Sequence, residues 1–151
     1  GIMDALSEAN VPASNIREID YHTVFGSSAE STSSYKPYEE LFFPVNYTAV
    51  IGFNDLQSYS AMEILQKKGY RIPEDISLIS FDHLRKTHTY LPPLTSIADN
   101  SEKSIADTAV SILLDKIRNP SSEISSEVLP VSIFDGHTTG PINETFAHSF
   151  E

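Results

Sequence analysis

The segment from Tyr47 to His83 constrains the fold most, because it contains two apolar runs separated by a helical pattern. The first run, "YTAVIGF", is β-branched and aromatic over most of its length, which is typical of a strand covered on both faces. The second run covers residues 76–81 and ends, like the first, in polar residues. Strand, helix and strand with short connections predict a βαβ unit, with parallel strands and a right-handed crossover.

The predicted helix between these strands begins after the pair Asn54-Asp55 and carries an apolar stripe. Gly69 suits the position just past its C-terminus, and Pro73 prevents its continuation. The stripe consists of Ser58, Ala61, Met62, Leu65 and Gly69, and Leu56 and Ile64 lie outside it. A helix that is apolar on more than one side often has two neighbours, so we expect a second contact besides the sheet.

The residues before this unit predict shorter elements. Residues 1–10 have the apolar spacing of a helix, and residues 16–19 predict a short strand. A serine-rich loop follows at 22–36. Ser34 or one of its neighbours can cap a helix that continues through Leu41.

The residues after the unit predict a second amphipathic helix. The stretch beyond Asp82 is expected to be irregular as far as Pro92-Pro93, because proline cannot take part in regular strand pairing. Asn100 or Ser101 can then cap a helix that ends before Pro120. The apolar stripe of this helix consists of Ala106, Ala109, Val110, Leu113 and Ile117.

The C-terminal part predicts one further strand and a tail. Residues 120–127 form a polar loop, and residues 128–134 have the apolar character of a strand. The tail after Pro141 is predicted to be disordered.

Composition and charge exclude several classes of function. The 151 residues carry 10 Lys and Arg residues against 21 Asp and Glu residues, which gives a formal net charge of -11. Because no basic cluster is present to neutralise phosphates, we expect no DNA binding by this chain itself. No apolar run approaches the ~20 residues that span a bilayer, so we expect no membrane insertion. The absence of cysteine excludes disulfides, thiolate nucleophiles and cysteine-ligated metals.

Polar residues follow both predicted strands at the point where each strand ends. Asn54-Asp55 comes after the first strand and Asp82-His83 after the second. The carboxyl ends of parallel strands share one edge of a sheet, where ligand crevices form, and amides and carboxylates suit a sugar, nucleoside or similar polyol. The alternative interpretations are structural: Asn54 or Asp55 caps the following helix, and Asp82 forms a turn.

Signatures of catalysis are missing from the sequence. "GSSAE" at 26–30 lacks the second glycine of a nucleophile elbow, and there is no glycine-rich phosphate loop or dinucleotide fingerprint. The histidines have no spacing that defines a metal site, and they are His22, His83, His88, His137 and His148. We therefore expect no enzyme, no metal site and no cofactor. The remaining enzymatic hypothesis is an α/β enzyme that uses Asp82 as a base or phosphoryl acceptor.

Taken together, three motifs resemble the effector-binding half of the lactose repressor/galactose repressor (LacI/GalR) family. They are "TAVIGFNDLQSYSAMEILQKKGYRIPEDISLISFDH" at 48–83, "LPPLTSI" at 91–97 and "VLPVSIFDGHTTGP" at 128–141. The spacing of the three motifs is far more specific than any one of them. The resemblance extends weakly back to Gly1 and covers about half of the family's sensor domain.

The resemblance implies an α/β fold with a Rossmann-like parallel sheet and flanking helices, as part of a type I periplasmic-binding-protein-like fold of two lobes around a cleft. It assigns residues 1–97 to the C-terminal lobe, with that lobe's first strand missing. Residues 98–134 would be a crossover helix and strand of the N-terminal lobe, and residues 135–151 a hinge-proximal segment and tail. It also implies a truncated sensor, in which the amphipathic helix of 98–134 has lost its sheet.

The resemblance also implies ligand-binding positions. Asn54 matches a ligand contact, Asp82 matches the acidic residue that binds sugar hydroxyls, and Asp99 matches a polar hinge contact. The family's effector-binding arginine precedes the equivalent of Gly1, and the loop that carries its stacking aromatic reads "SSAEST" here. Gly136 stands where an arginine is usual.

Members of the family dimerise through this lobe, so the resemblance implies a homodimer that uses residues 56–67 and 84–91. The expected interface residues are Leu56, Tyr59, Met62, Glu63, Leu84, Tyr90 and Leu91. The leading hypothesis is the sugar- or polyol-sensing part of a cytoplasmic bacterial transcription regulator, whose DNA-binding helix-turn-helix lies outside this chain. The alternative is a periplasmic sugar-binding protein of a transporter.

Overall fold

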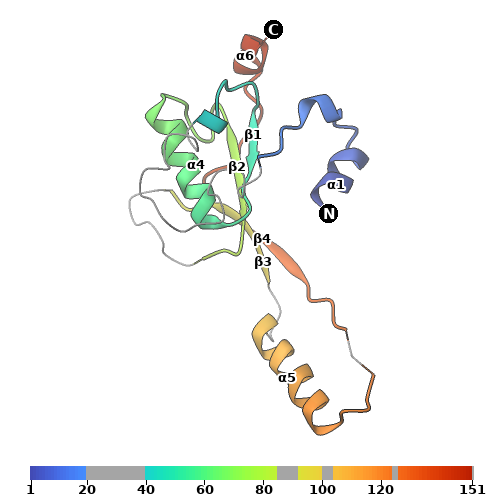
Figure 1. Cartoon of the computed structure of the whole chain (residues 1–151). Coiled ribbons are helices and arrows are strands. Elements are labelled where there is room, and N and C mark those ends of the chain that lie inside the picture. The colour runs from blue at the N-terminus through green and yellow to red at the C-terminus, as the bar shows by residue number, and fades with distance from the viewer. Residues whose placement is uncertain (20–39, 85–91, 100–103, 124–125, 151) are drawn as a thin grey trace.

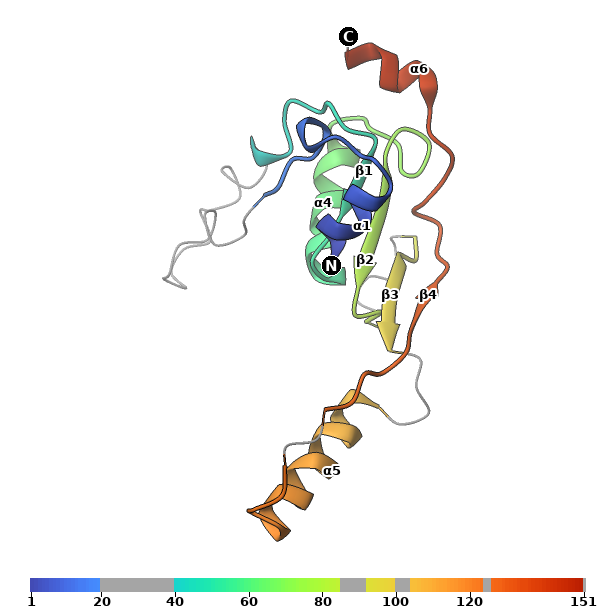
Figure 2. The ribbon, with the colours of Figure 1, turned by 90° about the vertical axis from the view of Figure 1, so that its right-hand side faces the viewer.

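The computed structural model describes residues 1–19, 40–84, 92–99, 104–123 and 126–150. The described elements begin with α1 (Ile2–Glu8), the 3-10 turn η1 (Ala13–Asn15), β1 (Ala49–Ile51), α4 (Asp55–Lys67) and β2 (Ser77–Phe81). They continue with β3 (Thr95–Asp99), α5 (Ile105–Arg118), β4 (Val131–Phe134), α6 (Glu144–Ala147) and the 3-10 turn η2 (His148–Phe150). Figures 1 and 2 show α4 and α1 on opposite sides of the sheet, with α5 beyond one end of it.

The four described strands form one sheet in the order β1-β2-β3-β4. β1 is parallel to β2, with Ile51 opposite Ile79, and β2 is parallel to β3, with Phe81 opposite Ile97. β4 is antiparallel to β3 and forms the far edge. The predicted fold class and the parallel β1-α4-β2 unit are confirmed. The sequence did not indicate β3, which starts two residues after Pro93, where proline ends the regular pattern.

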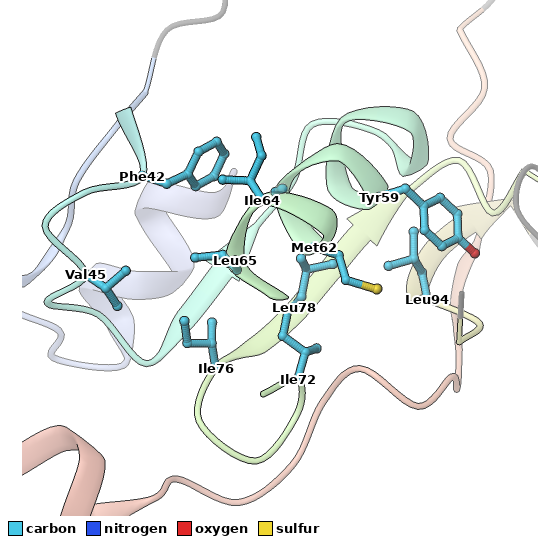
Figure 3. Packing of buried hydrophobic residues seen from close by; sticks show 11 residues of the cluster. Phe42, Val45, Tyr59, Met62, Ile64, Leu65, Ile72, Ile76, Leu78 and Leu94 are labelled. Carbon is cyan, nitrogen blue, oxygen red and sulfur yellow. The ribbon is translucent and has the colours of Figure 1, made fainter. Parts of the chain in front are cut away.

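The core lies between α4 and the facing side of the sheet (Figure 3). Met62 and Leu65 of α4 and Leu78 of β2 are fully buried. The whole buried apolar cluster consists of Phe42, Val45, Tyr59, Ala61, Met62, Ile64, Leu65, Ile72, Ile76, Leu78 and Leu94. The residues that this core joins, 40–84 and 92–99, are called the lobe below. The predicted apolar stripe of α4 is confirmed. Of the two apolar residues outside the stripe, Ile64 is buried and Leu56 is exposed.

Two glycines have conformations or contacts that a larger residue would disturb, one at the end of α4 and one beside its first turns. Gly69 has a φ of +94°, a left-handed conformation that favours glycine, and it terminates α4 as predicted. At Gly52, a Cβ atom would lie 1.8 Å from the Ser58 Oγ atom. A side chain at that position would therefore displace the Ser58 hydroxyl, which bonds α4 to Ser80 of β2.

The segment after β4 forms hydrogen bonds with β2 next to the start of β3. Thr138 lies between β2 and β3: its backbone oxygen accepts from the Leu78 N–H at 2.6 Å, and its hydroxyl donates to the Leu78 carbonyl at 2.7 Å. The same hydroxyl accepts from the Thr95 N–H at 2.9 Å. A Cβ atom at Gly136 would lie 2.3 Å from the backbone carbon of Leu94, so the two backbones touch there.

α5 extends away from the lobe in both views (Figures 1 and 2). Residues 104–123, which contain this helix, are called the arm below. Thr108 is the one buried residue of α5, a helix that the structure describes throughout. The large apolar residues that α5 exposes are Ile105, Val110, Leu113, Leu114 and Ile117. The N-cap is Ser104 rather than Asn100 or Ser101, two residues that lie outside the described part of the chain.

Two sequence predictions are wrong. Residues 16–19 form no strand, although Ile16 has an extended backbone. The contact of this segment with the lobe is a side-chain hydrogen bond, in which Arg17 donates to the Pro44 carbonyl at 3.2 Å. The tail after Pro141 is ordered as α6 and η2, because Phe146 packs edge-on against Tyr70 with ring centroids 5.9 Å apart. Apart from its last residues, Glu40 and Leu41, the helix predicted to begin near Ser34 lies outside the described residues.

The division of the chain into parts of two lobes stays a prediction. β4 belongs to the segment 98–134, which was assigned to the N-terminal lobe, yet in this structure it pairs with β3 in the same sheet as β1 and β2. Among the described residues, no helix is long and apolar enough to cross a membrane.

Candidate functional site

The carboxyl ends of β1, β2 and β3 meet at one edge of the sheet. The register places Ile51 beside Ile79 and Phe81 beside Ile97, so Asn54, Asp82 and Asp99 all follow at this edge. The structure therefore places the three predicted ligand-binding residues at the same edge: Asn54 at the start of α4, Asp82 after β2 and Asp99 at the end of β3. Such an edge is where open α/β sheets bind their ligands.

Asn54 is the N-cap of α4. Its Oδ1 atom accepts from the Gln57 N–H at 2.9 Å, so the structural interpretation of this residue is confirmed. The cap uses the oxygen of the amide group, which leaves the Nδ2 atom as the donor that Asn54 can offer to a ligand.

Asp82 is exposed at the end of β2, in a left-handed conformation with a φ of +88°. His83 is also left-handed, with a φ of +48°, so the chain turns sharply as it leaves the strand. The Asp82 N–H donates to the Ile97 carbonyl at 3.0 Å. The backbone of Asp82 is thus part of a turn, as the structural interpretation predicts, while its carboxylate lies free to accept hydrogen bonds from a ligand in solvent.

Asp99 is half-buried at the end of β3. Its Oδ2 atom accepts from the Ile105 N–H at 3.1 Å, at the first residue of α5. Asp99 therefore connects the edge of the sheet to the start of the arm. Because a carboxylate has several acceptor positions, this bond leaves capacity for further partners.

A buried hydrogen-bond network lies directly beneath this edge. The Asp55 carboxylate is 3% exposed; its Oδ2 atom accepts from the Leu84 N–H at 2.5 Å and its Oδ1 atom from the Ser96 hydroxyl at 2.9 Å. Ser58 of α4 donates to the Ser80 hydroxyl of β2 at 2.9 Å. Sequence analysis placed Asp55 at this edge but gave no sign of its partners, which lie up to 41 residues away along the chain.

Two aromatic features at this edge were also missed. Phe53 immediately precedes Asn54 and is 79% exposed, although it ends an apolar strand run. The His83 ring stacks on the Phe134 ring of β4, with centroids 4.0 Å apart and an interplanar angle of 13°. The signal for Phe53 was available in the sequence, as a large aromatic residue placed next to a polar strand end.

The predicted interface residues divide into three groups. Leu56 and Leu84 are exposed, at 56% and 47%, and Glu63 is half-buried. Tyr59 and Met62 are buried within the chain, at 8% and 0% exposure, and burial raises the pKa of Tyr59. Tyr90 and Leu91 lie outside the described residues. Met62 is thus a core residue and not an interface residue, because it belongs to the apolar stripe of α4 that faces the sheet.

The described residues hold no group of three potential ligands that could bind a metal ion. The edge offers an exposed carboxylate at Asp82 and an amide at Asn54 for hydrogen bonding, and the exposed Phe53 ring directly precedes Asn54 in the chain. These groups suit a ligand that carries hydroxyl groups and an apolar face.

Comparison with known proteins identifies the fold family. Residues 2–139 match the family described as "Periplasmic binding protein-like domain". The chain belongs to this family. The "HTH-type transcriptional repressor PurR" of Aliivibrio salmonicida is 34% identical over 124 residues, which is 82% of this chain and 35% of that protein. The chain thus spans about a third of the length of this relative.

Solved structures of similar fold agree with this assignment. A LacI family transcriptional regulator from Enterococcus faecalis, with bound ribose, has a TM-score of 0.63 and 26% identity. The alignment covers 75% of this chain and 42% of that regulator. The dimeric Lac repressor with a C-terminal deletion has a TM-score of 0.59 and 28% identity, and that alignment covers 72% of this chain and 39% of the repressor. The homologues of this periplasmic binding protein-like domain are therefore LacI-family transcription regulators, which supports the resemblance found in the sequence.

Proposed function

We propose that this chain is the effector-sensing part of a bacterial transcription regulator, and that its effector is a sugar or a related polyol. The observation that carries the proposal is that Asn54 and the exposed Asp82 follow two adjacent parallel strands at the same edge of the sheet. A carboxylate that accepts from two neighbouring hydroxyl groups forms charge-assisted bonds, which a deoxy analogue cannot match. The similar E. faecalis regulator has ribose bound, so ribose is the first probe.

In this proposal each residue of the edge has a separate role. Asp82 accepts from sugar hydroxyls, Asn54 donates through its Nδ2 atom, and the exposed Phe53 ring packs against the apolar face of the sugar. DNA binding would come from a helix-turn-helix outside this chain, because the net charge of -11 disfavours phosphate contacts. Effector binding would then shift the population between two forms of the whole regulator.

A calorimetric titration tests the proposal. Ribose and 2-deoxyribose are titrated into the wild-type chain and into the variants Asp82→Asn and Asp115→Asn, the second of which changes an exposed aspartate of the arm. We expect binding of ribose that weakens at least ~10-fold for 2-deoxyribose and for Asp82→Asn, because a hydrogen bond to a charged group contributes about 1.5–3 kcal/mol. Equal affinity in Asp82→Asn and wild type would contradict the role of Asp82.

We also propose that the chain forms a homodimer through the surface around Leu56 and Leu84, with Glu63 at its margin. Both leucines are exposed on the lobe, and the similar Lac repressor is dimeric. Tyr59 and Met62 are buried in the core and take no part in this surface. Sedimentation should show self-association that Leu56→Glu weakens and that Leu113→Glu, an equally exposed change in the arm, leaves unchanged.

The alternative function, a periplasmic sugar-binding protein of a transporter, shares the chemistry of the edge. The comparisons favour the regulator, because the similar proteins are named as repressors and regulators.

A further inference from the structure

The turn that presents Asp82 is held in a conformation that non-glycine residues rarely adopt. Asp82 and His83 have φ angles of +88° and +48°, and two successive left-handed residues are strained unless the surrounding structure fixes them. The position of the Asp82 carboxylate therefore depends on whatever holds this turn.

Three successive backbone N–H groups of the turn are hydrogen-bonded to the lobe. The Asp82 N–H donates to the Ile97 carbonyl at 3.0 Å, and the His83 N–H donates to the Ser96 hydroxyl at 3.0 Å. The Leu84 N–H donates to the Asp55 carboxylate at 2.5 Å. The last two bonds converge on one group, because the Ser96 hydroxyl in turn donates to Asp55 at 2.9 Å.

Asp55 is well placed to act as the anchor of this turn. It is 3% exposed and Ser96 is fully buried, so the bond between these two side chains lies where water competes little and a lost partner is costly. Asp55 is also the first residue of α4, where the helix dipole favours a negative charge. The carboxylate therefore lies at the N-terminus of the same helix that forms the core.

We propose that Asp55 is a positioning residue: it does not touch the effector, but it fixes the Asp82-His83 turn and joins that turn to the outer surface at Leu84. Asp55 is connected to the outer surface in two ways. The Leu84 N–H donates a hydrogen bond to Asp55, and Leu56 directly follows Asp55 in the chain. Both leucines are exposed. The part of the inference that concerns the effector rests on the proposed function.

The first experiment needs no ligand. Amide hydrogen exchange of His83 and Leu84 is measured by NMR in the wild type and in Asp55→Asn, Ser96→Ala and Ser58→Ala. Asp55→Asn keeps the shape of the side chain but turns one acceptor oxygen into a donor, so it no longer offers separate oxygens to the Leu84 N–H and the Ser96 hydroxyl, and it removes the charge that strengthens both bonds. We expect at least a tenfold loss of protection at Leu84 in Asp55→Asn, and at His83 in Ser96→Ala.

Ser58→Ala is the matched control, because it removes a buried hydroxyl that bonds Ser80 in the same region without contacting the turn. We expect unchanged protection of His83 and Leu84 in this variant. Unchanged protection of Leu84 in folded Asp55→Asn would overturn the inference. If Asp55→Asn does not fold, Ser96→Ala decides, because its His83 amide must then exchange faster than in the wild type.

The second experiment separates positioning from general destabilisation. The affinity for ribose is measured in Asp55→Asn, in Asp82→Asn and in the double variant. We expect Asp55→Asn to weaken binding about tenfold in the wild type and by less than twofold in the Asp82→Asn background, because Asp55 acts through Asp82. Fully additive losses would contradict this role. If the wild type binds no ribose, the effector proposal fails for this sugar, and exchange at Leu84 still decides whether Asp55 holds the turn.

Discussion

The two long helices, α4 and α5, have similar sequence patterns, but α4 is largely buried and α5 is largely exposed. Both begin at a polar N-cap, with an aspartate in the first turn and a basic residue in the last turn. α5 has the cleaner apolar stripe, yet Thr108 is its one buried residue, whereas α4 buries residues on most of its turns. An apolar stripe therefore shows that a helix can use a partner surface, and not that the described chain supplies one.

The difference comes from how each helix is connected to the sheet. α4 joins two adjacent parallel strands, so the crossover lays it across β2, and it contacts that strand closely. α5 joins β3 to the antiparallel β4, and the helix itself lies beyond the carboxyl end of β3 (Figure 1). The chain must return to β4 from there, which leaves α5 outside the lobe.

The largest expected effect compares one leucine from each helix. Leu65→Ala removes a fully buried side chain from the core, and we expect it to lower the free energy of unfolding by about 2–5 kcal/mol. Leu113→Ala removes a side chain that is 57% exposed, and we expect a loss below about 0.5 kcal/mol. Urea unfolding measures both. Similar losses would mean that α5 is packed in solution and would break the comparison.

The next effect concerns the point where the chain returns from the arm to the lobe. At Gly136 a Cβ atom would meet the Leu94 backbone at 2.3 Å, and a backbone cannot move aside as a side chain can. We expect Gly136→Ala to cost about 1–3 kcal/mol, as other overpacking substitutions do. Gly140→Ala is the matched control, because the nearest atom to its Cβ would belong to the Pro73 side chain, at 3.3 Å, and the Pro73 backbone oxygen would lie at an ordinary 3.8 Å. Equal costs in urea unfolding would show that the contact at Gly136 is dispensable.

The lobe could be predicted from the sequence much better than its surroundings. β1, α4 and β2 were predictable because burial imposes clear periods on their residues, and Gly69 and Pro73 mark the end of the helix. β3 was not, because its buried residues include Thr95 and Ser96, whose hydroxyls are satisfied only by distant partners. The ordered tail was missed because its aromatic packing depends on Tyr70, far away in the chain.

The candidate site shows the same division. Asn54 and Asp82 were predictable, because parallel strands deliver their final residues to one edge. The roles of Asp55 and Ser96 were not, because hydrogen bonds between residues 29 and 41 positions apart leave no pattern in the sequence. Met62 was expected at the dimer interface because of the family resemblance, but it lies in the core because the α4 stripe that contains it faces the sheet.

A smaller effect compares the two helix caps. Asn54 accepts from the Gln57 N–H at 2.9 Å, and Ser104 accepts from the Asp107 N–H at 3.1 Å. Each cap contributes about 1 kcal/mol to its helix. We expect Asn54→Ala to lower the stability of the whole lobe by this amount, because α4 forms its core. Ser104→Ala should instead speed amide exchange within α5 only.

Tyrosine fluorescence during urea unfolding separates these outcomes, because residues 104–123 contain no tyrosine and the signal therefore comes from outside the arm. The midpoint should shift for Asn54→Ala and stay in place for Ser104→Ala. A shift of the midpoint in both variants would show that the arm and the lobe unfold together.

The smallest effect is the pH dependence of an ion pair in the lobe. The Asp75 carboxylate accepts from the Arg71 guanidinium at 2.9 and 2.6 Å, and this hydrogen bonding lowers the pKa of Asp75 below its usual value of 3.8. Because the pKa is lower in the folded state, the pair stabilises the fold above the usual pKa and ceases to do so as the pH falls through the folded-state value.

We therefore expect Asp75→Asn to lower the urea midpoint slightly at pH 7, by less than any lobe substitution above, since the Arg71 side chain is largely exposed. The difference from the wild type should shrink as the pH falls below 3.8, the usual pKa of the group. Asp115→Asn, in the arm, is the control and should shift the midpoint at neither pH. A difference for Asp75→Asn that is the same at pH 7 and in acid would mean that the loss comes from the bond to Asn143, at 3.3 Å, rather than from the charge.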